Sequence, residues 1–117
     1  AVPRQSGRLA AEAESTAGMY IRIRYETDPR SGARRVRLLL GKQAWFGLGS
    51  PERIDIQRVG GEIWIVEAKG KSGLTIHTDV GLPACIVPDG GPLERLTPGR
   101  YAATMRAGAL IVGARVA

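Results

Sequence analysis

The sequence predicts a mostly β fold, either a small barrel or a set of interleaved β-hairpins with one or two short helical turns. Two observations lead to this prediction. Apolar and polar residues alternate with a period of two in several stretches, and glycine-containing turns separate those stretches. The chain has 117 residues, 44% of them hydrophobic, which is enough for one modest core and too little for two. We therefore expect a single β-rich domain.

The first predicted hairpin is followed directly by a short helix. Apolar residues alternate with arginine over residues 20–26, and the alternation resumes over 34–40 after the turn-forming residues 27–32. Residues 41–47 are expected to form one or two helical turns, which Gly47 ends.

The remaining segments predict further strands. Gly60-Gly61 supplies a tight turn between alternating stretches, and a flexible connector follows. A less polar set of short strands, one helical turn and a last hairpin about Ala107-Gly108 complete the chain. The expected segments are strands 53–58 and 63–68, connector 68–73, strands 74–78 and 84–87, a helical turn at 93–96, and strands 100–106 and 109–116.

Residues 1–18 are predicted to form an extended N-terminal arm, with the compact domain spanning residues 19–117. The arm contains a short Ala-rich stretch with little apolar surface. An isolated segment of this kind is marginally stable, because helix nucleation is costly. We expect a neighbouring subunit or another partner to hold it.

An internal duplication is suggested by a shift of 47 residues. The shift places Pro51 over Pro98, Arg53 over Arg100 and Gly61 over Gly108. These identities are too few to establish a repeat. The repeated order of strand, short turn, Pro-containing bend and Gly-tipped hairpin is the stronger observation. It suggests two pseudo-repeats, 19–68 and 74–117, which would make one chain resemble a homodimer.

Positive charge is concentrated in the first hairpin. The chain has 17 Lys and Arg against 11 Asp and Glu, a net charge of +6. Residues 19–42 carry +5 of this excess, because only Glu26 and Asp28 oppose their basic residues. Such a patch indicates a polyanionic partner, most commonly nucleic acid, although a solvated or subunit-facing charged edge is the alternative. The candidate nucleic-acid-binding residues are Arg22, Arg24, Arg30, Arg34, Arg35, Arg37 and Lys42.

Part of the chain resembles a known family. The matching segments are Arg35-Val36-Arg37-Leu38 through Gly47-Leu48, then residues 52–56 and 60–65. They resemble the AbrB/SpoVT/MazE class of swapped-hairpin DNA-binding domains over roughly residues 19–68. In that family, basic residues of the first hairpin contact DNA, which implicates Arg35 and also Arg24, Arg30 and Arg37.

The sequence also departs from the family's pattern at several positions. Leu39 stands where the family usually has Pro, and Ser50-Pro51-Glu52 replaces a Pro-Gly-Asp bend. Gln43 and Ala44 occupy helix positions that are often basic in the family.

We expect no enzymatic activity, no metal and no cofactor. Cys85 is the single cysteine and His77 the single histidine, which is too few for an ordinary zinc site. Cys85 also argues against a disulfide scaffold and fits a reducing compartment. His77 and Asp79 share a face of a predicted strand, but no nucleophile accompanies them. No apolar run is long enough to cross a membrane, so we expect a cytoplasmic protein.

Three functions are compatible with these features. The first is a DNA-binding protein of transcription-regulator type, a homo-oligomer that contacts DNA through the Arg-rich hairpin. The second is a structural subunit, such as a capsid decoration protein of a virion, whose arm grips a neighbour while the basic hairpin meets an acidic protein surface. The third is an inhibitor that binds a nucleic-acid enzyme.

Overall fold

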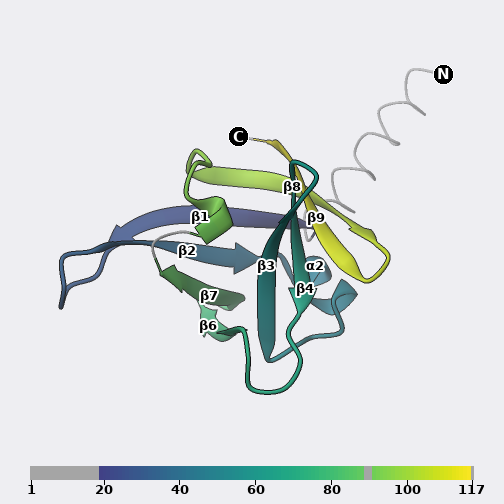
Figure 1. Ribbon diagram of the computed structural model, residues 1–117, viewed down its shortest axis with the longest axis horizontal. Helices are drawn as coiled ribbons and strands as arrows, with labels where there is room; N and C mark the ends of the chain where they lie inside the picture. The colour runs from purple at the N-terminus through teal and green to yellow at the C-terminus, as the bar shows by residue number, and fades with distance from the viewer. Residues whose placement is uncertain (1–18, 89–90, 117) are drawn as a thin grey trace.

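The computed structural model describes residues 19–88 and 91–116, so the predicted arm of residues 1–18 lies outside it. Within this part of the chain, nine strands pair into one antiparallel sheet, accompanied by a short helix and a 3-10 turn (Figure 1). The mostly β fold class is confirmed. The elements are β1 (Tyr20–Thr27), β2 (Arg34–Leu40), α2 (Lys42–Gly47), β3 (Arg53–Val59), β4 (Glu62–Glu67), β5 (Leu74–Thr75), β6 (His77–Asp79), β7 (Leu82–Pro88), η1 (Gly91–Leu93), β8 (Gly99–Arg106) and β9 (Ala109–Arg115).

The sheet curls into a nearly closed barrel. Its strand order is β5-β3-β4-β9-β8-β1-β2-β7-β6, so β5 and β6 stand at opposite ends of the sheet. Only Ile76 separates these two strands along the chain. The segment Leu74–Asp79 therefore pairs with β3 through its first half and with β7 through its second half. This one segment joins the two ends of the sheet.

Alternation along the strands fills the inside of the barrel with apolar side chains. Ile21 and Ile23 of β1, Leu38 of β2 and Ile65 of β4 are almost completely buried in one cluster. Cys85 belongs to the same cluster, and burial raises the pKa of its thiol to about 12. The thiol is therefore neutral and inaccessible at neutral pH.

The helix α2 closes one end of the core. It buries Ala44 beneath it, and the indole N–H of Trp45 donates to the Pro51 carbonyl over 3.0 Å. The second helical segment is a 3-10 turn at Gly91–Leu93, earlier than the predicted 93–96. The predicted residues still form a turn, because the Leu96 N–H donates to the Leu93 carbonyl over 3.0 Å. The Tyr25 hydroxyl from β1 lies against the carbonyl oxygens of Leu93, Glu94 and Leu96.

The strand pairing repeats in the two halves of the chain. Leu38 of β2 pairs with Cys85 of β7, and Trp64 of β4 pairs with Ile111 of β9. In both pairs the two residues are 47 positions apart in the sequence. The hairpin pair Ile56–Ile65 likewise corresponds to Ala103–Val112. A pseudo-two-fold axis therefore relates the halves. The common origin of the two halves stays a prediction.

The two halves differ most in their first hairpin. Residues 28–33 connect β1 to β2, whereas only Val80 and Gly81 connect β6 to β7. The longer hairpin extends beyond the barrel, as Figure 1 shows at the left. At the shift of 47, Arg35 corresponds to Leu82 and Arg37 to Ala84. The arginine-rich surface therefore belongs to one half of the barrel alone.

None of the helices within residues 19–88 and 91–116 is long and apolar enough to span a membrane.

Gly73, directly before the closing segment, provides a test of the packing there. Its φ is +89°, and a Cβ at this position would overlap the Ala68 side chain and lie 2.7 Å from the Ile54 carbonyl oxygen. We expect Gly73→Ala to lower the free energy of unfolding by about 3 kcal/mol, from backbone strain and overlap together. Urea denaturation followed by tryptophan fluorescence measures this.

The matched control is Gly70→Ala in the same connector. Gly70 also has a positive φ, +69°, but a Cβ there meets nothing within 4 Å. Only backbone strain remains, about 1 kcal/mol. Equal losses in the two variants would show that the closing segment is not tightly packed at Gly73.

Candidate nucleic-acid interface

Strand alternation places four of the predicted arginines on the outer face of the barrel. Ile21 and Ile23 of β1 point inward, so Arg22 and Arg24 point outward. The same alternation on β2 turns Arg35 and Arg37 outward. The register sets Arg24 opposite Arg37 and Glu26 opposite Arg35. The two strands thus present one arginine-rich ribbon face.

Glu26 holds two of these guanidinium groups. Its Oε1 accepts from Arg35 Nε at 2.8 Å and from Arg37 Nη2 at 2.9 Å, and its Oε2 accepts from Arg37 Nε at 3.0 Å. The Arg37 contact is a two-point fork, the geometry that fixes a guanidinium most firmly. The hydrogen bonds from Arg37 are the main reason that the pKa of Glu26 lies below its ordinary value. Hydrogen bonding to Glu26 likewise raises the pKa of Arg37.

Asp79 joins the network from the other half of the chain. Its Oδ2 accepts from Arg24 Nη2 at 3.2 Å and from Arg37 Nη1 at 3.3 Å. Arg37 Nη1 also lies 3.4 Å from His77 Nε2. The sequence places His77 and Asp79 on one face of a strand, and both side chains contact Arg37. Asp79 therefore belongs to an ion-pair network with the first hairpin, and His77 lies beside it.

The remaining predicted cations are placed differently. Arg22 and Arg30 are exposed and form no ion pair with any residue in the described ranges. Arg34 lies on the opposite face of the ribbon, where its guanidinium stacks 3.9 Å above the centre of the Tyr25 ring. Lys42 is on α2, apart from the ribbon, and lines a pocket with Trp45. The structure thus brings together Arg24, Arg35 and Arg37, places Arg22 beside them, and separates Arg34 and Lys42.

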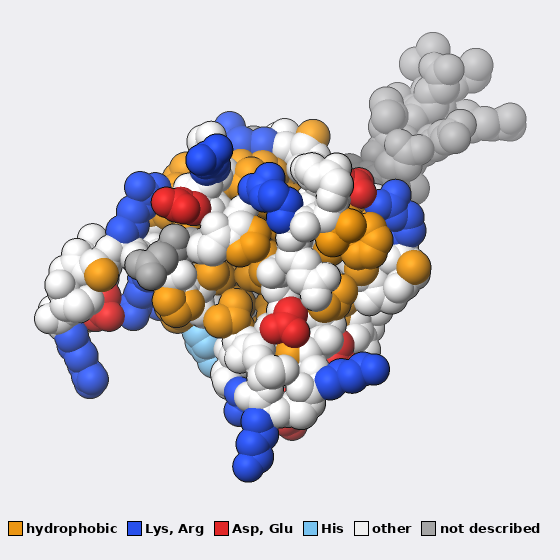
Figure 2. All heavy atoms as spheres, in the orientation of Figure 1, with side chains coloured by type: hydrophobic (Ala, Val, Ile, Leu, Met, Phe, Trp, Pro, Cys, Tyr) orange, Lys and Arg blue, Asp and Glu red, His pale blue; other side chains and the backbone are white. Residues whose placement is uncertain are grey.

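The loop at the tip of the hairpin is ordered by its own hydrogen bonds. Asp28 Oδ1 accepts from the backbone N–H of Arg30 at 2.8 Å, which is the main reason that the pKa of Asp28 is lowered. Gly32 and Asp28 close the turn through a backbone hydrogen bond of 2.8 Å. Figure 2 shows basic side chains on this projecting tip, with an acidic one between them.

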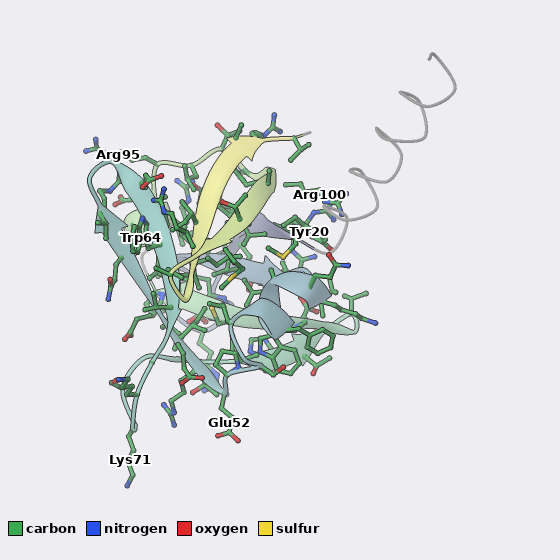
Figure 3. The ribbon with its side chains drawn as sticks, turned by 90° about the vertical axis from the view of Figure 1, so that its right-hand side faces the viewer. Tyr20, Glu52, Trp64, Lys71, Arg95 and Arg100 are labelled. Atoms are coloured by element: carbon green, nitrogen blue, oxygen red, sulfur yellow. The ribbon has the colours of Figure 1, made fainter. Side chains whose placement is uncertain are left out.

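Arg100 is a basic residue beside the ribbon that sequence reasoning missed. It lies directly opposite Arg22 in the β1–β8 pairing, and its guanidinium is 3.9 Å above the centre of the Tyr20 ring. Figure 3 shows Tyr20 and Arg100 side by side. They are 80 positions apart in the sequence, and only the pairing of β1 with β8 brings them together. No local pattern around Arg100 indicates this contact.

No protein-family model, no curated protein and no solved structure matches this chain. The resemblance to AbrB/SpoVT/MazE domains therefore stays a prediction. In residues 19–88 and 91–116 there is also no group of three or more metal-binding side chains.

The lowered pKa of Glu26 gives a prediction about stability and pH. Because the folded pKa lies below the unfolded value of about 4.3, the ion pairs stabilise the fold above that pH, and this contribution is lost as the pH falls through the lowered pKa. We expect Glu26→Gln to lower the free energy of unfolding at pH 7 by about 1–2 kcal/mol. It should also reduce the loss of stability that the wild-type protein shows on acidification.

Glu62→Gln is the matched control. Glu62 pairs with Arg106 at 2.7 Å, but both side chains are about half exposed. Such a pair contributes roughly 0.5 kcal/mol or less. Urea denaturation at pH 7 and pH 3 compares both variants with the wild type. If Glu26→Gln is no more destabilising than Glu62→Gln, the Glu26 network does not hold the ribbon.

Proposed function

We propose that the protein binds double-stranded DNA through the β1–β2 hairpin, as a DNA-binding protein of transcription-regulator type. The observation that carries this proposal is the ribbon face itself, on which Arg22, Arg24, Arg35 and Arg37 project from two paired strands. A two-stranded antiparallel ribbon is one of the elements that the major groove of DNA admits. The predicted resemblance to AbrB-like domains supports the same assignment.

The charge balance of the hairpin favours an anionic partner even after its internal ion pairs are counted. Glu26, Asp28 and Asp79 offset three of the six arginines of the hairpin, which leaves an excess of +3. Arg22 and Arg30 make no ion pair within the described part of the chain, so they are available for phosphate contacts. Phosphate contacts of this kind supply affinity and register.

The carboxylates also give the ribbon a fixed geometry. Arg35 and Arg37 are held by Glu26, and Arg24 by Asp79, before any partner arrives. A guanidinium that is already oriented loses less conformational freedom when it meets phosphate or guanine. We therefore propose that these three arginines form the preset part of the surface and that Arg22 and Arg30 make direct phosphate contacts.

Each chain carries one arginine-rich hairpin, which limits the symmetry of the DNA site it can bind alone. The second half of the barrel has no matching arginines, so a single chain offers one contact surface despite its pseudo-symmetry. A palindromic site would require two chains, in keeping with the predicted homo-oligomer. The alternative of a capsid or other structural subunit uses the same basic hairpin, and its distinguishing feature, the arm of residues 1–18, lies outside the described residues.

Salt-titrated binding to duplex DNA tests the proposal. We expect the logarithm of the association constant to fall linearly with the logarithm of the salt concentration. Arg22→Ala and Arg30→Ala should each reduce that slope by about 0.9 and weaken binding by roughly 3- to 10-fold near 0.1 M salt. Fluorescence anisotropy of a labelled duplex measures both quantities.

Lys71→Ala removes the same charge from another surface. Figure 3 shows Lys71 at the tip of a loop, far from Tyr20 and Arg100. This variant should bind DNA nearly as well as the wild type. Binding that is independent of salt, or equal losses in Lys71→Ala and Arg22→Ala, would contradict a role for the hairpin in DNA binding.

A further inference from the structure

An apolar pocket lies between α2 and the β6–β7 hairpin. Its volume is about 340 Å³, within the range of small-molecule sites. The walls are formed by the rings of Trp45 and Phe46 from α2, by Pro51, and by Ile76 and Pro83 from the closing region of the barrel. Trp45 is fixed by its hydrogen bond to Pro51, so this wall is rigid. The pocket lies outside the ribbon face assigned to DNA.

Two exposed apolar residues mark this side of the molecule. Phe46, the only phenylalanine in the chain, is 61% exposed. Val80 is 86% exposed and has a φ of +52°, a conformation that is strained for a β-branched residue. Val80 lies between Thr78 and Gly81, which both line the pocket. The two-residue turn between β6 and β7 accounts for this φ, whereas the apolar exposure serves no core and is typical of binding surfaces.

The polar groups at the rim are mainly hydrogen-bond donors. Lys42 lines the pocket and makes no ion pair with any residue in the described ranges. His77 contacts Arg37 Nη1 through Nε2, and a guanidinium can only donate. In the neutral ring, Nδ1 then carries the proton and is the donor. The Thr78 hydroxyl is a third group at the rim that can donate.

Glu52 is the one carboxylate that lines the pocket. Figure 3 shows its side chain extending away from the body of the protein into solvent. Its charge therefore lies at the outer edge of the pocket. The backbone carbonyl of Glu52 accepts a hydrogen bond of 2.8 Å from the Ile76 N–H. The donors of Lys42, His77 and Thr78 are the polar groups that remain to orient a ligand.

We propose that this pocket binds a small organic carboxylate with a flat apolar body. The body lies between the aromatic rings of α2 and the side chains of Ile76 and Pro83, and the carboxylate accepts from Lys42 and His77. This site goes beyond the proposed DNA binding and does not depend on it, since no residue of the ribbon face lines the pocket.

Calorimetric titration of the 117-residue chain tests the site. The probes are 3-phenylpropionate, indole-3-acetate and cyclohexanecarboxylate, with the amide and the amine analogues of the first for comparison. We expect at least one carboxylate to bind with a dissociation constant below about 1 mM. Phenylpropionate should bind at least about tenfold more tightly than its amide and its amine, because the rim supplies donors.

Variants at the rim and the wall complete the test. Lys42→Gln should remove most of the preference for carboxylate over amide, whereas Phe46→Ser should weaken all probes. Both side chains are exposed, so both variants should fold, which circular dichroism checks. Lys71→Gln is the control and should bind like the wild type. The proposal is overturned if no carboxylate binds, if the amine binds as well as the carboxylate, or if Lys42→Gln keeps the full preference.

Discussion

Closure of the barrel by the segment Leu74–Asp79 is the constraint on which the other features depend. By pairing with β3 at one end and β7 at the other, it leaves the sheet without long open edges. In the closed sheet β1 and β2 lie between β8 and β7, with Arg22, Arg24, Arg35 and Arg37 facing outward. The closing segment also carries His77 and Asp79 to Arg37, and Ile76 and His77 to the apolar pocket. Both proposed surfaces therefore adjoin the same segment.

The ion pairs change how the charge of the first hairpin is interpreted. In the sequence, residues 19–42 look like a nearly uniform basic patch. In the fold, Glu26 and Asp79 fix Arg24, Arg35 and Arg37 in position, whereas Arg22 and Arg30 form no ion pair within the described residues. The hairpin thus combines a set of paired arginines with exposed arginines that are not paired. Such an arrangement is suited to a partner whose charges are spread along a line, as phosphates are along DNA.

Local patterns in the sequence predict most of the fold and only part of the candidate site. The alternation around Ile21 and Ile23 and the Gly60-Gly61 turn correctly predict hairpins, because period-two patterns and turn residues act over a few positions. The contacts of Asp79 and Arg100 with the first hairpin depend on pairing between distant strands, which has no local signal. The contact of the Tyr25 hydroxyl with the Glu94 carbonyl likewise joins residues 69 positions apart.

A titration of isotopically labelled protein with a short DNA duplex, followed by the backbone amide signals in NMR spectra, tests the central claim most directly. The account predicts that the largest chemical-shift changes fall on β1, β2 and residues 28–33, with smaller ones near Tyr20 and Arg100. Changes concentrated on β3, β4 or the connector around Lys71 would contradict it, as would the absence of any change at low salt.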